Sequence, residues 1–477
     1  MPNPDAAEAP ILPLAADFPD PGRAAWLALA EKTLKGAPLE SLTWRTVEGL
    51  EVRPLYEPGV WPSAPAGRPG AWDIRTVVRG PDVGAANAQA VQDLAGGATS
   101  LLIEIDPTGA GGVALGDAGD LARVLEGVLV DIAPIALDAG FLGAKAADWL
   151  ATAAKGAPAA ALGLGMDPLS AFARSGASPG PIEAHLIACA GVGARLADAY
   201  PKASLFAASG RAAHEAGGGE ALELATALAA ALAYAKALSR AGMPVAAAFE
   251  RIELGLALDA DPFLAIAKLR AARQLWARLA GACGSSAPAR IEARSSGRML
   301  TRADPWTNMI RLTAAAFAGG VGGADTVTLG AFTDALGLPG PLARRQSRNI
   351  QLVLAEEANL GRVADPAAGC GYVEDLTGVL AHAAWQRFQA IEAAGGAIKA
   401  LESGLVAREA DASRAELARR LGAREMKLLG VTDFAAAEGQ PVDLEPAGRA
   451  VDAPSPRLPG PDSRCPPLSP IRLEDLA

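Results

Sequence analysis

From about residue 98 the chain alternates short apolar runs with amphipathic stretches, and this alternation constrains its fold more than any other feature. Each apolar run is followed by a helical stretch, which is the pattern of βα units in a parallel sheet. An eighth strand would fall within residues 170–203, where the pattern is weak. The seven clearer candidate strands are Ser100–Asp106, Pro134–Asp138, Ala160–Met166, Ser204–Ser209, Ile252–Leu258, Arg290–Ser295 and Asp325–Leu329.

Helical periodicity fills the intervals between these strands. Seven or eight βα units favour a closed (β/α)8 barrel over an open, doubly wound sheet. The open sheet would need a glycine-rich phosphate loop, but no GxGxxG follows a strand, and the GAGG at Gly109–Gly112 lacks the spacing. We therefore predict an α/β protein with a TIM-type barrel. The predicted helices between the strands include Glu220–Ala241, Phe263–Ala282, Trp306–Ala318 and Leu342–Ala358.

The rest of the chain extends this barrel at both ends. We predict an N-terminal arm and extended subunit-contact segment (1–70), the barrel (71–360), a helical extension (361–440) and a Pro-rich tail or linker (441–477). The arm contains a predicted helix from Pro21 to Lys35, with Asp20 as its N-cap. The tail has linker composition, so it either lies on a partner, marks a lost domain or is a frayed terminus.

Composition excludes several classes of function. The net charge is −10, from 43 basic and 53 acidic residues, which disfavours nucleic acid and anionic membranes as partners. The four cysteines are far apart and only three histidines occur, so we predict no metal site. The N-terminus lacks the basic and apolar regions of a signal peptide, and no apolar run reaches the roughly 18 residues of a membrane span. We expect a cytoplasmic protein.

Several blocks, in this order along the chain, resemble the methylmalonyl-CoA mutase family, and more closely its small, non-catalytic subunit. Any one block is weak, but the ordered succession is specific and covers most of residues 20–435. The blocks include Trp26–Gly36, Pro54-Leu55-Tyr56, Lys268–Leu279 (KLRAARQLWARL), Arg311-Leu312-Thr313, Ala335–Pro339, Arg348–Leu354, Asp365-Pro366 and Tyr372-Val373-Glu374.

The resemblance implies an adenosylcobalamin-dependent complex that interconverts methylmalonyl-CoA and succinyl-CoA in acyl-CoA and propionate metabolism. In the catalytic subunit, as the resemblance implies, a barrel encloses the CoA chain and a separate C-terminal domain holds the cobalamin through a histidine. The cofactor supplies the radical chemistry, and the protein positions and secludes the reactants.

This sequence departs from the family pattern at three places. No Asp-x-His-x-x-Gly motif occurs, so we expect the cobalamin-binding domain to be absent and the cofactor to lie on a partner subunit. The family's Tyr-His pair is replaced by Arg211 and Ala212, and an alanine side chain can neither donate a hydrogen bond nor transfer a proton. The family's Thr-Met-Tyr is also lost, because Ser63–Gly67 precedes Arg68 here. We therefore predict no catalytic residue on this chain.

Four residues are candidates for a vestigial site. His214 and Glu215 follow a predicted strand, where barrel sites lie, although we favour a structural hydrogen bond for His214. Arg270 and Arg273 share a helix face and would suit a phosphate clamp for CoA. The alternative, which we favour, is a solvated or subunit-facing ion-pair face.

The predicted function is that of a non-catalytic small subunit of methylmalonyl-CoA mutase, which stabilises a catalytic large subunit in a heterodimer. We expect the barrel axis to be filled by side chains such as Leu102, Glu104, Leu254 and Leu256. One alternative is a catalytic acyl-CoA mutase subunit that uses a cobalamin domain on a separate chain. Another is a ligand-binding or assembly protein built on a decayed barrel.

Overall fold

The structure is a computed structural model, and it describes residues 17, 22–56, 59, 68, 70–80, 82–106, 111–435, 441–446 and 458–477. The chain divides into two compact units, Met1–Tyr56 and Glu57–Ala477. The first unit contains α1 (Gly22–Leu34), a 3-10 turn η1 (Leu39–Leu42) and an antiparallel pair of short strands, β1 (Trp44–Arg45) and β2 (Glu51–Val52). The helix predicted over 21–35 is confirmed as α1, while its predicted cap, Asp20, lies outside the described residues.

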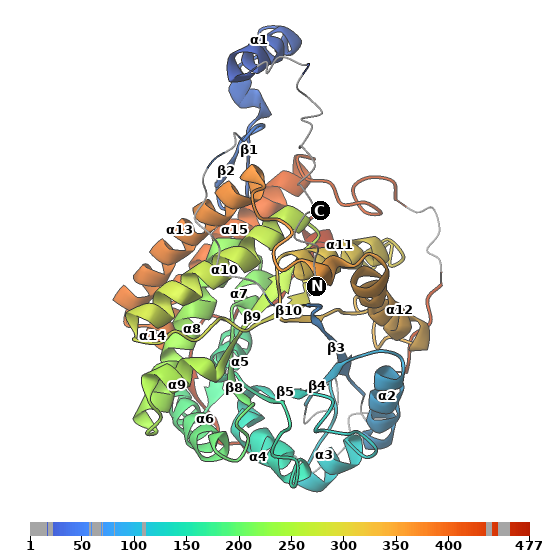
Figure 1. Cartoon of the computed structure of the whole chain (residues 1–477), viewed down its shortest axis with the longest axis vertical. Coiled ribbons are helices and arrows are strands. Elements are labelled where there is room, and N and C mark those ends of the chain that lie inside the picture. The colour runs from blue at the N-terminus through green and yellow to red at the C-terminus, as the bar shows by residue number, and fades with distance from the viewer. Residues whose placement is uncertain are drawn as a thin grey trace, which may run out of the picture. The chain divides into compact units, whose positions relative to one another are not determined.

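The second unit is built on a closed barrel of eight strands, all paired in parallel (Figure 1). The predicted (β/α)8 barrel is therefore confirmed. Around the ring the strands follow chain order: β3 (Asp73–Val78), β4 (Ser100–Glu104), β5 (Ile135–Asp138), β6 (Leu162–Met166), β8 (Ser204–Ser209), β9 (Ile252–Leu258), β10 (Ile291–Ser295) and β11 (Thr326–Thr328).

Seven strands lie where the alternation predicts them, but the position of the eighth was wrong. It is β3, the first strand of the barrel, and it precedes the region in which the pattern is clear. Residues 170–203 instead contain most of α5 (Pro168–Ser175), the short strand β7 (Ala177–Pro179) and α6 (Ile182–Ala197). The sequence of β3, DIRTVV, hides its strand character because Arg75 stands on the inward face, where an apolar residue is expected.

Helices surround the strand ring (Figure 1). Several begin at an aspartate whose carboxylate accepts backbone N–H groups of the first turn, as Asp82, Asp167 and Asp261 do. The helices of this layer are α2 (Val83–Ala95), α3 (Ala118–Val124), α4 (Gly143–Ala153), α6, α8 (Glu220–Arg240), α10 (Pro262–Ala282), α11 (Asn308–Val321) and α12 (Pro341–Leu352), with the short α7 (Arg211–Glu215) and α9 (Val245–Glu250) between them.

Helix α8 is long and apolar enough to cross a membrane by length and composition. Most of that apolar surface, however, is buried inside the protein. It packs between strands β8 and β9 and helix α13 (Gly371–Ala393), so its composition is that of a core helix.

The helical extension covers one side of the barrel. Helix α12 runs into a π-helical turn, η4 (Val353–Glu357), and the chain continues through η5 (Leu360–Arg362), α13, α14 (Ala397–Glu402) and α15 (Leu405–Gly422). Helix α13 packs against α8 and α10. The segment predicted as a helical extension, 361–440, does contain α13, α14 and α15, while the predicted domain boundaries stay predictions.

Residues 458–477, which we call the C-terminal strap, bind to the barrel of their own chain. The strand β12 (Pro461–Arg464) pairs antiparallel with β7, and the strap ends in a 3-10 turn, η6 (Leu473–Leu476). Between them, the backbone N–H of Leu468 donates to the Ala173 carbonyl (2.7 Å), and that of Ile471 donates to the Glu215 carbonyl (2.8 Å). The composition of the segment did not reveal this docking. Proline has no backbone N–H, and the strap binds through the backbone N–H groups of a few isolated residues that lie between its prolines.

Strand β6 depends on one glycine. Gly165 has a left-handed φ of +58°, at a register shift between Gly163 and Met166. A Cβ on Gly165 would lie 1.7 Å from the carbonyl oxygen of Leu137 on the neighbouring strand β5. Only glycine permits both the backbone conformation and this close approach.

We expect Gly165→Ala to lower the free energy of unfolding by more than about 3 kcal/mol, through backbone strain and a steric clash in the barrel wall. Denaturant or thermal unfolding followed by circular dichroism measures this change. The control is Gly191→Ala on α6, where nothing lies within 4 Å of the added methyl group and no left-handed φ is needed. Equal stability of the two variants would contradict the proposed role of Gly165.

Candidate functional site

The inside of the barrel is lined by charged side chains. Arg294 of β10 contacts Glu292 of the same strand (Nε to Oε1, 3.0 Å) and also reaches Asp138 of β5 (Nη1 to Oδ2, 3.0 Å). In the closed ring of eight strands, β5 and β10 are four places apart, on opposite sides. The contact between Arg294 and Asp138, which we call the cross-barrel ion pair, therefore spans the lumen.

Neighbouring strands support the cross-barrel ion pair. Arg75 of β3 lies 3.5 Å from Glu292, and its Nε donates to the hydroxyl of Ser100 (3.0 Å). Thr328 of β11 also donates to Glu292 (3.0 Å). Burial opposes ionisation of Glu292, but the charges of Arg294 and Arg75 outweigh it and lower the pKa of Glu292 to about 2. These groups are therefore ionised at neutral pH.

Of the four residues predicted to fill the barrel axis, two face the lumen and two do not. Leu102 and Glu104 do share the inward face of β4 with Ser100, and Glu104 contacts Arg79. Leu254 and Leu256, in contrast, lie on the face of β9 opposite to Glu253, because side chains alternate along a strand. Glu253 is the inward residue, since its charge acts on Arg75, which faces the lumen, and it accepts a hydrogen bond from Ser204 (3.4 Å). The lumen is thus filled mainly by charged groups and only partly by aliphatic ones.

A cavity of about 310 Å³ lies at the carboxyl ends of the strands, and we call it the barrel-mouth cavity. This is the face at which TIM barrels hold their active sites. The C-terminal strap forms part of its wall through Leu468, Pro470 and Arg472. Its charged lining consists of Arg79, Arg174, Arg211, Arg294, Arg472, Glu104, Asp138, Glu215 and Asp334.

At this cavity the strap is held through the Arg472 side chain, which binds backbone carbonyls. Arg472 donates to the carbonyl oxygens of Gly297 (3.1 Å) and Leu300 (3.4 Å), which follow strand β10. Glu215 accepts the backbone N–H groups of Gly297 and Arg298, both at 3.2 Å. Glu215 and the strap thus hold the same loop from two sides.

Next to the cavity lies a buried charge cluster. His214 is fully buried, with Nδ1 3.2 Å from Glu223 and Nε2 3.5 Å from Asp259. The Lys268 ammonium contacts both Glu220 and Glu223, the latter at 2.6 Å. Arg298 lies 2.8 Å from Asp259. The buried charge cluster comprises His214, Glu220, Glu223, Asp259, Lys268 and Arg298.

The surroundings of His214 keep it protonated. Burial and the positive charge of Arg298 lower its pKa, but Glu223 and Glu220 outweigh them and raise the pKa to about 10. A protonated His214 gives the cluster three positive and three negative groups, so that the buried charges balance.

Three members of the cluster, His214, Glu220 and Glu223, offer ligand atoms within 4.8 Å of one another, close enough for a metal ion. The chemistry of the set argues against a metal. Lys268 already places a cation against both carboxylates, and a protonated imidazole has no lone pair for a metal. The cluster is therefore a structural ion network.

The structure separates the four predicted site residues. Glu215 lines the barrel-mouth cavity, but His214 is enclosed in the buried charge cluster. Arg270 pairs with Asp365 and with Glu374 (2.6 Å). Arg273 donates to the carbonyl of Ala289 (2.9 Å) and pairs with Asp325 (3.0 Å).

These partners correct the interpretation of helix α10. Arg270 and Arg273 are only 3% and 5% exposed, so their face of the helix is neither solvated nor open to a subunit. Both are engaged within the chain and lie on the outer helical layer, away from the barrel-mouth cavity, so a CoA phosphate clamp has no support in the geometry.

The residues at the family's Tyr-His positions do face the cavity. Arg211 and Ala212 both line it, at the start of α7. Arg68, of the third departure, donates instead to the carbonyls of Ala324 (2.9 Å) and Gly320 (3.1 Å), while residues 63–67 lie outside the described part of the chain.

The histidines do not fit an axial cobalamin ligand. His214 is enclosed by charges, and His185 is bonded to the Pro179 carbonyl (2.6 Å). His382 is exposed on α13 and does not line the barrel-mouth cavity. No residue described here offers both a free imidazole and a pocket for a corrin.

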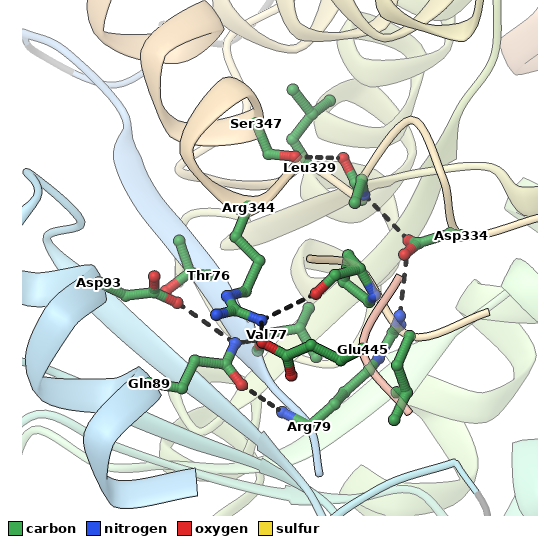
Figure 2. Close-up of a pocket in the computed structure, with 14 residues that line it drawn as sticks. Thr76, Val77, Arg79, Gln89, Asp93, Leu329, Asp334, Arg344, Ser347 and Glu445 are labelled. Carbon is green, nitrogen blue, oxygen red and sulfur yellow. Dashed lines mark hydrogen bonds and ion pairs between the residues drawn. The ribbon is translucent and has the colours of Figure 1, made fainter. Parts of the chain in front are cut away.

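A second, smaller pocket of about 40 Å³ lies between β3, β11, α2 and α12 (Figure 2). Gln89 donates to the Val77 carbonyl (2.8 Å), and Arg344 donates to the Pro339 carbonyl (2.8 Å) and to Glu445 (2.6 Å). Figure 2 shows these side chains converging on the pocket. These side chains bind one another and leave little space for a ligand. The contact between Arg344 and Glu445 attaches residues 441–446 to the barrel.

Comparison with known proteins agrees with the fold and the motifs. The family model described as methylmalonyl-CoA mutase matches residues 54–453. The chain is 40% identical to the methylmalonyl-CoA mutase small subunit of Streptomyces virginiae, over 94% of this chain and 76% of that protein. It is 35% identical to the small subunit from Propionibacterium freudenreichii subsp. shermanii, over 91% and 72% of the two chains. Against the methylmalonyl-CoA mutase of Cereibacter sphaeroides the identity is 31%, over 88% and 65%.

We expect Lys268→Met to lower the free energy of unfolding by about 3–5 kcal/mol, because it leaves Glu220 and Glu223 buried without their shared cation. Urea denaturation of the full chain measures the loss. Lys202→Met, which removes an exposed lysine, is the matched control. A Lys268→Met protein as stable as this control would show that the buried charge cluster contributes little.

The raised pKa of His214 gives a defined pH dependence. Its contribution to stability is complete below the unfolded-state pKa of 6.5 and is lost as the pH rises through about 10. The stability advantage of the wild type over His214→Gln should therefore shrink between pH 6.5 and 10, as urea denaturation at several pH values will measure. An imidazole NMR titration of His214 with a midpoint near 6.5 would contradict this assignment.

Proposed function

The chain belongs to the methylmalonyl-CoA mutase family, and we propose that it serves there as a non-catalytic small subunit that stabilises a catalytic large subunit. Relatives 35–40% identical over most of the chain carry the small-subunit name, which supports this role. The acyl-CoA rearrangement would then take place on the partner subunit. We place the complex in the cytoplasm and assign its reaction to propionate metabolism.

The cross-barrel ion pair carries the non-catalytic part of the proposal. A catalytic barrel of this family is expected to enclose the CoA chain along its axis. Here Arg294 and Asp138 meet across that axis, with Glu292 and Arg75 beside them. Threading a CoA chain would have to separate buried, ionised groups, and breaking one buried pair costs about 3–5 kcal/mol.

The cavity lining supports the same conclusion. Ala212 stands where the family has a histidine and offers no side-chain donor toward a thioester carbonyl. Adenosylcobalamin supplies the radical chemistry when it is bound, and we assign it to the partner, since the residues here do not fit an axial ligand. What this chain supplies is a barrel whose lumen is crossed by the paired charges of Arg294, Asp138 and Glu292.

Co-expression with a large subunit tests the proposal. We expect a stable one-to-one complex by size-exclusion chromatography with light scattering, and a higher melting temperature for the large subunit in the complex than alone. The lone chain, supplied with methylmalonyl-CoA and adenosylcobalamin, should give no turnover, while the complex should be active.

Three outcomes would contradict the proposed role. Turnover by the lone chain would refute the non-catalytic role. Co-purification from native cells with a small cobalamin-binding protein, and with no large subunit, would favour the alternative of a catalytic mutase subunit that uses a cobalamin domain on a separate chain. Transient association alone would favour an assembly protein.

A further inference from the structure

The charged groups of the barrel-mouth cavity are unequally partnered. Its four carboxylates are all engaged within the chain. Glu104 and Asp334 both contact Arg79, at 2.5 and 3.5 Å, and Asp138 is held in the cross-barrel ion pair. Glu215 accepts two backbone N–H groups. None of these carboxylates depends on a ligand for a partner.

Two of the five arginines in the same lining differ. Arg79 and Arg294 are paired with those carboxylates, and Arg472 donates to backbone carbonyls. Arg174 and Arg211, in contrast, make no side-chain hydrogen bond or ion pair within the described ranges. The Nε of Arg211 is buried without any acceptor there. The cavity thus presents two guanidinium groups whose donors are unused.

The electrostatics around Arg211 also indicate a cation that lacks a counter-charge. Burial and the charge of Arg294 lower the pKa of Arg211 more than the carboxylates of Glu215, Glu292 and Asp138 raise it. Arg211 is only partly exposed, and its buried Nε without an acceptor destabilises the folded chain. A bound anion would remove that cost, since the guanidinium fork matches the two oxygens of a carboxylate or phosphate.

We propose that the barrel-mouth cavity is a binding site for a small oxyanion, a carboxylate or a phosphate, which Arg211 holds with help from Arg174. Arg211 stands on α7, after β8, and Arg174 on α5, after β6, so both approach the ligand from adjacent strands of the ring. The remaining wall is apolar at Leu300, Leu468 and Pro470.

The size of the cavity limits the ligand. About 310 Å³ is near the lower end, roughly 300 Å³, of pockets that bind small molecules. The cross-barrel ion pair closes the route into the lumen, so a molecule of a few heavy atoms fits and an extended one does not. The residues that line the site all come from this chain.

Isothermal titration calorimetry on the full-length chain tests the site with two probes, malonate and inorganic phosphate, at constant ionic strength in chloride. We expect saturable one-to-one binding of at least one probe, and the preferred probe distinguishes a carboxylate ligand from a phosphate ligand. Arg211→Gln should weaken binding at least tenfold, and Arg211→Lys should keep part of the affinity, because a charge remains without the fork.

Two further variants keep the test interpretable. Arg174→Gln changes a more exposed side chain and should also weaken binding, which covers the case in which Arg211→Gln does not fold. Arg240→Gln, at the exposed end of α8, removes the same charge elsewhere and should leave the affinity unchanged. Absence of saturable binding for both probes, or an affinity that Arg211→Gln and Arg174→Gln leave unaltered, would overturn the proposal.

Discussion

The contact between Arg294 and Asp138 is the constraint on which the rest of the barrel depends. TIM barrels usually fill their interior with layers of branched aliphatic side chains, which tolerate small shifts of one strand against another. An ion pair across the lumen tolerates less, because both partners lose their stabilisation together when they separate. The strands that carry Arg75, Glu292 and Arg294 must therefore keep their register, and close approaches such as that of Gly165 to strand β5 help to hold it.

The positions of seven barrel strands followed from the sequence because most strands are apolar on their outward faces. The charged residues of Arg290–Ser295 were visible in the sequence as well. Their position inside the barrel could not be predicted, since a charge within a strand pattern more often indicates an edge strand or a loop. The same feature hid β3, where Arg75 interrupts the apolar run. Local patterns also could not show that Leu254 and Leu256 face the helices, because either face of a buried strand can be apolar.

The motif register predicted which residues stand at the family's catalytic positions, and Arg211 and Ala212 do lie at the barrel mouth. The ion network beside them could not be predicted in this way. Lys268 meets Glu220 across 48 residues, and Arg298 reaches His214 across 84, so only the closed fold brings them together. The helix around Lys268 was therefore visible as a sequence block, whereas the partners of its lysine and arginines lie on other elements.

An interior held by charges responds to temperature differently from an aliphatic one. The hydration free energy of ions becomes less favourable on warming, so the cost of keeping Arg294, Glu292 and Asp138 away from water falls as temperature rises. The attraction between them remains. The centre of this barrel thus becomes more favourable on warming, while the hydrophobic stabilisation of the contacts between strands and outer helices levels off. Thermal disruption should therefore begin in the surrounding shell and reach the axis last.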